Sequence, residues 1–132
     1  MGKFKSFEEI VAWQKAYEVT LEVYRVTSDG SFSKDFGLKD QIRRASVSMM
    51  ANIAEGHGRR TNSEFANFLN LARGSAAEVQ SHLYVGVGLN YLDREKFDEL
   101  YSSLDQISKM TLSLARYLRD SDRKLRNSAP QL

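Results

Sequence analysis

Residues 93–118 read DREKFDELYSSLDQISKMTLSLARYL, and this stretch decides the fold class. Asp93 can cap the start of a helix. Core-type positions then alternate three and four apart through three heptads, namely Phe97, Leu100, Leu104, Ile107, Thr111, Leu114 and Leu118. A repeat of 3.5 residues is typical of helices that pack nearly antiparallel with a left-handed twist. The stretch therefore predicts a long helix in a helical bundle.

Two segments before this stretch show the same helical period. Thr61-Asn62-Ser63-Glu64 is a capping box that begins a helix reaching about Leu89, with an apolar line of Phe65, Leu69, Ala72, Ala76, Val79, Leu83 and Val87. A helix from about Leu38 carries Leu38, Ile42, Ala45, Met49 and Ile53 on one face. We expect it to end at Gly56-His57-Gly58, where glycine can adopt the left-handed cap conformation.

A further helix is predicted near the N-terminus. Ser6-Phe7-Glu8-Glu9 is a capping box, and the helix that follows should end near Ser28 and bury Ile10, Trp13, Tyr17, Leu21 and Tyr24. Residues 29–37 (DGSFSKDFG) lack a period and predict a mobile loop. The pattern predicts an all-α fold, an antiparallel up-down-up-down four-helix bundle in one domain over residues 1–120, followed by a flexible tail over 121–132.

Composition excludes several kinds of site. The chain of 132 residues has no cysteine, which removes disulfides, thiolate zinc sites and cysteine nucleophiles. Its apolar runs fall short of the roughly 18–20 residues of a membrane span, and acidic residues interrupt MGKFKSFEEI where a signal peptide is apolar. We therefore expect a cytoplasmic protein without a membrane partner. The net charge of +2 requires that any nucleic-acid surface be a local patch.

The helix over residues 38–57 has more than one apolar face. Residues 45–54 (ASVSMMANIA) carry no charge, and Val47, Met50 and Ala54 lie roughly opposite the core positions. Two interpretations are open: a central helix covered by its own bundle, or a subunit interface formed by these three residues. We also expect a structural polar network on this helix and the next, comprising Arg44, Asn52, Glu55 and Glu78, with Arg44 paired to Glu55 or Glu78.

Catalytic and metal chemistry have little support. His82 follows Glu78 by one turn, but the Glu-x-x-His spacing of di-iron bundles is missing, so we expect no metal and no cofactor. Gly86-Val87-Gly88 follows no strand and lacks the P-loop lysine, which favours close helix packing and helix termination. No catalytic triad can be argued, and we expect no enzyme.

Basic residues give the one functional signal with a physical mechanism. We predict phosphate contacts from Lys39, Arg43, Arg59, Arg60 and Arg73, the last on the outer side of its helix. The arginines and lysine over residues 116–126 rank behind them, because they reach into the tail that we expect to be disordered, and they can also simply complement a helix dipole. An ordinary solvated surface is the alternative for all of these side chains.

Several motifs together resemble the four-helix bundle family of proteins encoded in intervening sequences of bacterial 23S ribosomal RNA genes. They are Trp13-Gln14-Lys15-Ala16, Phe36-Gly37-Leu38, Gln41-Ile42-Arg43-Arg44-Ala45, Asn52-Ile53-Ala54-Glu55-Gly56, Gly58-Arg59-Arg60 and Gly74-Ser75 with Glu78. The resemblance implies a ring-shaped homopentamer related to the basic accessory protein of diversity-generating retroelements, which works with a reverse transcriptase and its RNA. The chain departs from the family pattern at Met50, where members often have proline, and in its low net charge.

Two functions follow from the sequence. The first is a homo-oligomeric protein that binds structured RNA or a nucleoprotein partner. The alternative is a structural or protein-interaction module without nucleic-acid binding.

Overall fold

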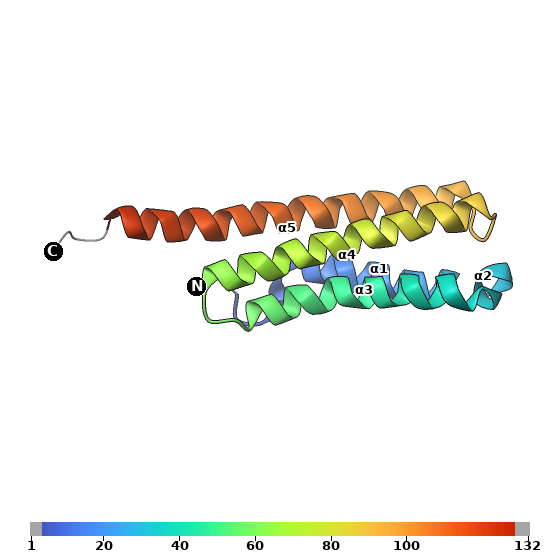
Figure 1. Ribbon diagram of the computed structural model, residues 1–132, viewed down its shortest axis with the longest axis horizontal. Helices are drawn as coiled ribbons and strands as arrows, with labels where there is room; N and C mark the ends of the chain where they lie inside the picture. Colours follow the sequence, from blue (N-terminus) through green and yellow to red (C-terminus); the bar gives the residue numbers. More distant parts are fainter. Residues whose placement is uncertain (1–3, 129–132) are drawn as a thin grey trace.

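The computed structural model describes residues 4–128. In this part of the chain the structure is all-helical, without strands, as the sequence predicts. A 3-10 turn, η1 (Phe7–Glu9), precedes five α-helices: α1 (Val11–Val26), α2 (Gly30–Lys34), α3 (Phe36–His57), α4 (Asn62–Gly88) and α5 (Arg94–Ser128). The long helices lie side by side, and α2 covers one end (Figure 1).

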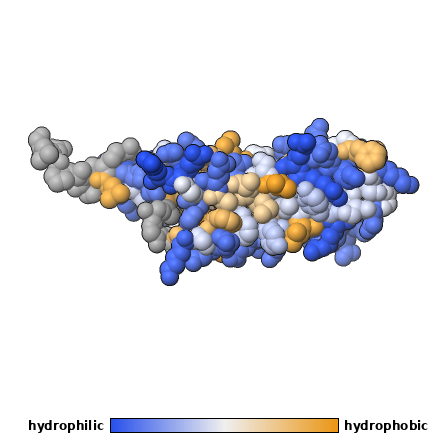
Figure 2. Space-filling view, turned by 90° about the horizontal axis from the view of Figure 1, so that it is seen from below, coloured by the Kyte–Doolittle hydropathy of each residue, from blue (hydrophilic) through white to orange (hydrophobic). Residues whose placement is uncertain are grey.

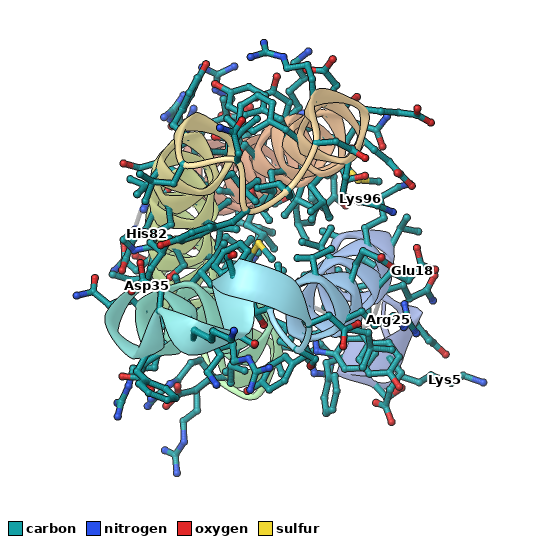
Figure 3. All side chains as sticks on the ribbon, turned by 90° about the vertical axis from the view of Figure 1, so that its right-hand side faces the viewer. Lys5, Glu18, Arg25, Asp35, His82 and Lys96 are labelled. Atoms are coloured by element: carbon teal, nitrogen blue, oxygen red, sulfur yellow. The ribbon has the colours of Figure 1, made fainter. Side chains whose placement is uncertain are left out.

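One cluster of buried side chains joins the helices. The apolar lines predicted on α3, α4 and α5 contribute to it, with Met49, Leu69 and Leu104 fully buried. Seen end-on, α1 and α3 form one layer and α4 and α5 the other (Figure 3). No helix among the described residues is long and apolar enough to cross a membrane.

Two of the three predicted N-terminal helix caps form. The Thr61 hydroxyl accepts a hydrogen bond from Glu64 N at 3.1 Å, and Asp93 Oδ1 accepts one from Lys96 N at 2.8 Å. The prediction at Ser6 was wrong: its side chain makes no cap hydrogen bond, and α1 begins at Val11 after η1. Glu9 instead accepts a hydrogen bond from the Lys5 amide, which stabilises the 3-10 turn.

The prediction of a loop at residues 29–37 was also wrong, because α2 and the start of α3 occupy most of this segment. Phe32 on α2 is fully buried and packs against Tyr91, with ring centroids 5.3 Å apart. A Cβ on Gly86 would lie 3.2 Å from the Phe32 ring and 2.8 Å from Leu92. The expectation of close packing at Gly86 is thus confirmed, and the buried aromatic ring explains why the segment is ordered into a helix.

The buried face of α1 differs from the predicted one. Ile10 is buried as expected, but the other core positions are the small or β-branched residues Ala12, Ala16, Val19, Thr20 and Val23. Tyr17, Leu21 and Tyr24 are exposed, and Trp13 is half-buried. Thr20 can be buried because its hydroxyl donates to Ala16 O at 2.8 Å and to Ser46 O at 3.0 Å. Small residues here let α1 approach α3 closely.

The ends of α3 and α5 bring two further corrections. α3 continues through Gly56 to His57, and its C-cap Gly58 has a right-handed φ of −78°, so no left-handed cap forms. Gly56 is buried in the helix beside Phe65 and Phe68. α5 does not stop near residue 120 but extends to Ser128, beyond the start of α4 (Figure 1). Residues 129–132 of the expected flexible tail lie outside the described residues.

Candidate functional site

The five predicted phosphate contacts do not form one patch within a chain. Lys39 and Arg43 lie in the first third of α3, whereas Arg59 and Arg60 lie in the turn that leads to α4. With a rise of 1.5 Å per residue, Lys39 and Arg59 are about 30 Å apart along the helix axis. A nucleic acid that contacts all of them would have to follow the length of the molecule.

Arg43 has a structural role that the sequence analysis missed. Its Nε donates to Thr27 Oγ1 at 2.8 Å, its Nη2 donates to Ser28 Oγ at 3.2 Å, and its guanidinium lies 4.4 Å from the Tyr24 ring centroid. These contacts join α3 to the C-terminal end of α1. The side chain is half-buried and donates to neighbouring groups of its own chain, so few of its N–H groups are left to contact a ligand.

The turn between α3 and α4 offers the more accessible cations. Arg59 stacks on Phe68 at 4.6 Å and pairs with Glu55 at 3.1 Å. Arg60 is exposed and has no hydrogen-bond or ion-pair partner within residues 4–128. Both arginines line a polar pocket of about 130 Å³ together with His57, Thr61 and Asn62. Arg60 is therefore the predicted contact that is most available to an anion.

The other two predicted phosphate contacts, Arg73 and Lys39, already contact groups of their own chain. Arg73 is half-buried and does not project freely from the outer side of its helix, which corrects the prediction. Its Nε is buried without a partner, while Nη1 donates to Asn70 Oδ1 at 3.3 Å. Lys39 is also half-buried, and its Nζ lies 5.0 Å from the Phe36 ring centroid. On α5, the secondary candidates Arg119 and Arg123 contact Asn67 and Asp120.

The predicted polar network is not formed in the chain. Arg44 pairs with Asp40 at 2.8 Å, and both side chains are largely exposed. Glu55 pairs with Arg59, and Glu78 contacts His82 at 3.3 Å. Each charge finds a partner four residues away in the sequence, which costs less ordering than a buried pair between helices. Arg44 is thus a surface residue rather than part of a buried network.

Asn52 belongs to a smaller polar cluster between α3 and α4. Its Nδ2 donates to Ser48 O at 2.9 Å, and Ser75 Oγ donates to Ser48 Oγ at 3.1 Å. Ser48 and Ser75 were not predicted as a contact. Their pairing depends on the register of two helices, which the helical period alone does not give.

An apolar surface runs along α1 and α3, and we call it the α1/α3 face. It consists of two stripes: Trp13, Tyr17, Leu21 and Tyr24 on α1, and Val47, Met50 and Ala54 on α3. The two helices run antiparallel, because Arg43 of α3 stacks on Tyr24 of α1, and Ser46, further along α3, contacts Thr20, which comes earlier on α1. Tyr17 and Trp13 therefore lie level with Met50 and Ala54. Figure 2 views this side, with hydrophobic and neutral residues along its middle and hydrophilic ones around them.

The α1/α3 face is open to solvent in the single chain. Tyr17, Leu21, Tyr24 and Val47 are between 37% and 44% exposed, while Met50 and Ala54 are half-buried. Trp13 and Tyr17 stack with centroids 5.4 Å apart and an interplanar angle of 3°, and Phe7 packs edge-on against Trp13 at 5.0 Å. The rings thus form a preordered surface. The predicted interface residues Val47, Met50 and Ala54 make up its α3 half.

Groups suited to metal binding are absent from the described part of the chain. Among residues 4–128, no three His, Asp or Glu side chains lie close enough together to hold a metal ion. The Glu78 and His82 pair is on the surface of α4, without a further acidic neighbour in contact.

Comparison with known proteins identifies the family. No curated protein matches the chain. One similar solved structure is the 1.70 Å crystal structure of a protein with unknown function from the S23 ribosomal protein family of Bacteroides thetaiotaomicron VPI-5482. It shares 25% sequence identity and a TM-score of 0.74, over 80% of this chain and 96% of that one. The family model described as 23S rRNA-intervening sequence protein matches residues 8–113. The chain therefore belongs to the 23S rRNA-intervening sequence protein family.

Proposed function

We propose that this protein is a non-enzymatic, cytoplasmic scaffold without a cofactor. In this proposal its long helices form an up-down-up-down bundle, and copies of the bundle assemble into a homo-oligomeric ring, a pentamer. The α1/α3 face supports the assembly, because several large apolar side chains are exposed there on adjacent helices. The family resemblance favours five subunits.

The ring would bind structured RNA or a nucleoprotein partner. The observation that carries this proposal is Arg60, an exposed arginine without a partner among the described residues, beside Arg59 at a tight turn. A ring repeats this modest patch once per subunit and makes phosphate binding multivalent. The resemblance to the accessory protein of diversity-generating retroelements, which works with a reverse transcriptase and its RNA, supports RNA as the partner.

Two measurements test the proposal. Native mass spectrometry at micromolar concentration should give the mass of a pentamer, and a monomer would contradict the assembly. Filter binding with structured RNA across about 50–200 mM salt should show affinity that falls steeply with salt. Arg60→Gln should lower the slope of the logarithm of affinity against that of salt by about 1 for each Arg60 in contact with a phosphate. Arg44→Gln, which removes an exposed arginine already paired with Asp40, is the matched control.

A protein-interaction module without nucleic-acid binding is the second candidate. It is favoured by the contacts of Arg43, Arg59 and Arg73 within their own chain, which occupy three of the five side chains predicted to contact phosphate. Absence of RNA binding at the low-salt end, with the oligomer intact, would favour this function over the first.

A further inference from the structure

Phe36, the first residue of α3, carries the most exposed large apolar side chain of the described residues, at 73%. Two hydrogen bonds to the preceding residue, Asp35, fix the backbone at this point. Asp35 Oδ1 accepts a hydrogen bond from Leu38 N at 3.1 Å and caps α3, while Asp35 Oδ2 accepts one from the Tyr91 hydroxyl at 3.0 Å. The ring is therefore held out into solvent on a rigid base, at the end of the molecule where α2 lies (Figure 1).

A single exposed ring is ordinary on a protein surface, but the surroundings of Phe36 are not. The ring lies between two open hollows, and Phe36 and Gly37 line both of them. One hollow, of about 520 Å³, also contains Lys39 and Arg43. The other, of about 730 Å³, also contains Lys34 and the Tyr91 side chain. Both hollows are shallow and open to solvent, and the Lys39 ammonium lies 5.0 Å from the Phe36 ring centroid beside the first, which leaves the second for a planar ring to approach Phe36.

The charges around Phe36 favour an anionic ligand. Neither Lys34 nor Lys39 has an ion-pair partner in residues 4–128. Asp40 is paired with Arg44 at 2.8 Å, whereas Asp35 accepts hydrogen bonds from Leu38 N and the Tyr91 hydroxyl and keeps its negative charge beside Lys34. Two unpaired cations thus flank an exposed aromatic ring.

We propose that Phe36 stacks on an unpaired base of single-stranded RNA, while the phosphates on either side of that nucleotide contact Lys34 and Lys39. Aromatic platforms with neighbouring cations are the chemistry by which proteins bind single strands. Double-stranded RNA offers Phe36 few bases to stack on, because its bases are stacked inside the helix and its major groove is deep and narrow. This inference rests on the proposed RNA-binding function and names the form of RNA that this end of the molecule takes.

The test measures fluorescence anisotropy of labelled oligouridine of about 12 nucleotides, within the site sizes of single-strand binders, and of an RNA duplex of equal length. The full chain is compared with Phe36→Ala, Phe36→Tyr and Leu89→Ala. Leu89 is the matched control, because it is also an exposed apolar residue, at 53%, but lines neither hollow. Phe36→Ala should weaken oligouridine binding by about 5- to 150-fold, the range for loss of one stacked base. Phe36→Tyr and Leu89→Ala should bind as the parent does, and duplex affinity should not change.

Salt dependence separates stacking from charge. Phe36→Ala should leave the salt slope of oligouridine binding unchanged, whereas Lys39→Gln should lower it by about 1. Equal oligouridine affinity of Phe36→Ala and the parent protein would overturn the inference alone. So would a change of native mass in Phe36→Ala, because the ring would then cover a contact between copies of the chain. If the parent binds neither RNA at low salt, the proposed RNA-binding function itself fails.

Discussion

The lack of a side chain at Gly56 allows α3 to approach α4 closely. A Cβ at this position would lie 2.7 Å from Phe68 Cβ and 2.9 Å from Phe65 Cδ1. Because Phe68 Cβ is attached to the backbone, it cannot move aside without shifting α4. Glycine is therefore required here by close approach, and not by a left-handed backbone as the sequence suggested.

We predict that Gly56→Ala lowers the free energy of unfolding by about 1–3 kcal/mol, the usual cost of overpacking. The matched control is Gly74→Ala in α4, where an added Cβ meets no heavy atom within 4 Å. That substitution should raise the free energy of unfolding by about 0.5–1 kcal/mol, because alanine favours helix. Urea unfolding at fixed protein concentration measures both. Equal effects of the two substitutions would contradict the close approach.

Arg43 and Arg44 are neighbours whose substitutions should lower stability by different amounts. Arg43→Met should lower the free energy of unfolding by about 1.5–3 kcal/mol, since it removes charge-assisted hydrogen bonds that join α3 to Thr27 and Ser28 directly after α1. Arg44→Met removes only an exposed pair with Asp40 and should cost about 0.5 kcal/mol or less. Thermal unfolding of the two variants distinguishes them, and a larger loss for Arg44 would refute the assignment.

At the scale of elements, the contact between α1 and α5 depends on an ionic cluster. Lys96 on α5 lies 3.3 Å from Glu22 on α1 and 3.1 Å from Glu99, and Arg25 lies 2.8 Å from Glu22. Figure 3 shows Lys96 and Arg25 on this side of the molecule, opposite Asp35 and His82. Hydrogen bonds from Arg25 and then Lys96, opposed by partial burial, lower the pKa of Glu22, and hydrogen bonds to Glu99 and Glu22 raise the pKa of Lys96.

This cluster should make part of the stability depend on pH. A carboxylate whose pKa is lower in the folded than in the unfolded state stabilises the fold above the ordinary value of 4.5 and loses that contribution as the pH falls through the folded pKa. We expect Glu22→Gln to lower the melting temperature at pH 7 slightly and to flatten its fall between pH 5 and about pH 3. Glu18→Gln, a change of an exposed glutamate on the same helix, is the control. If the melting temperature of Glu22→Gln fell as steeply below pH 5 as that of the parent protein, the prediction would be contradicted.

The elements also show what the sequence could and could not predict. The helical period placed α3, α4 and α5 and most of their buried lines correctly, because apolar residues recur along those lines. It chose the wrong face of α1, since the aromatic residues there look like core while the core is built from Ala12, Ala16 and Thr20. Thr20 is buried only because Ser46 on another helix accepts its hydrogen bond. Such a contact depends on helix register, which also hid the roles of Arg43 and Ser75.

At the scale of the whole molecule, the α1/α3 face is separate from Arg60 and Phe36, the two residues on which the RNA proposals rest. The α1/α3 face runs along the middle of one side (Figure 2), whereas Arg60 lies at the turn into α4 and Phe36 at the start of α3. Both ends of α3 therefore carry candidate RNA contacts, and the face between them is left for another copy of the chain. Assembly through that face would leave both ends of each subunit accessible.

A charge at the centre of the α1/α3 face should separate the subunits. Val47→Glu places a carboxylate on this face one turn after Arg43, and taking that charge out of water at a subunit contact would cost several kcal/mol. Val85→Glu is the matched control, because Val85 is 46% exposed, much as Val47 is at 43%, but lies on α4 outside the face. Native mass spectrometry at micromolar concentration should show a lower oligomeric state for Val47→Glu alone, with helical content by circular dichroism unchanged in both variants. An intact oligomer in Val47→Glu would place the subunit contact on another surface, and it would also remove the reason for the aromatic stripe of α1 to be exposed.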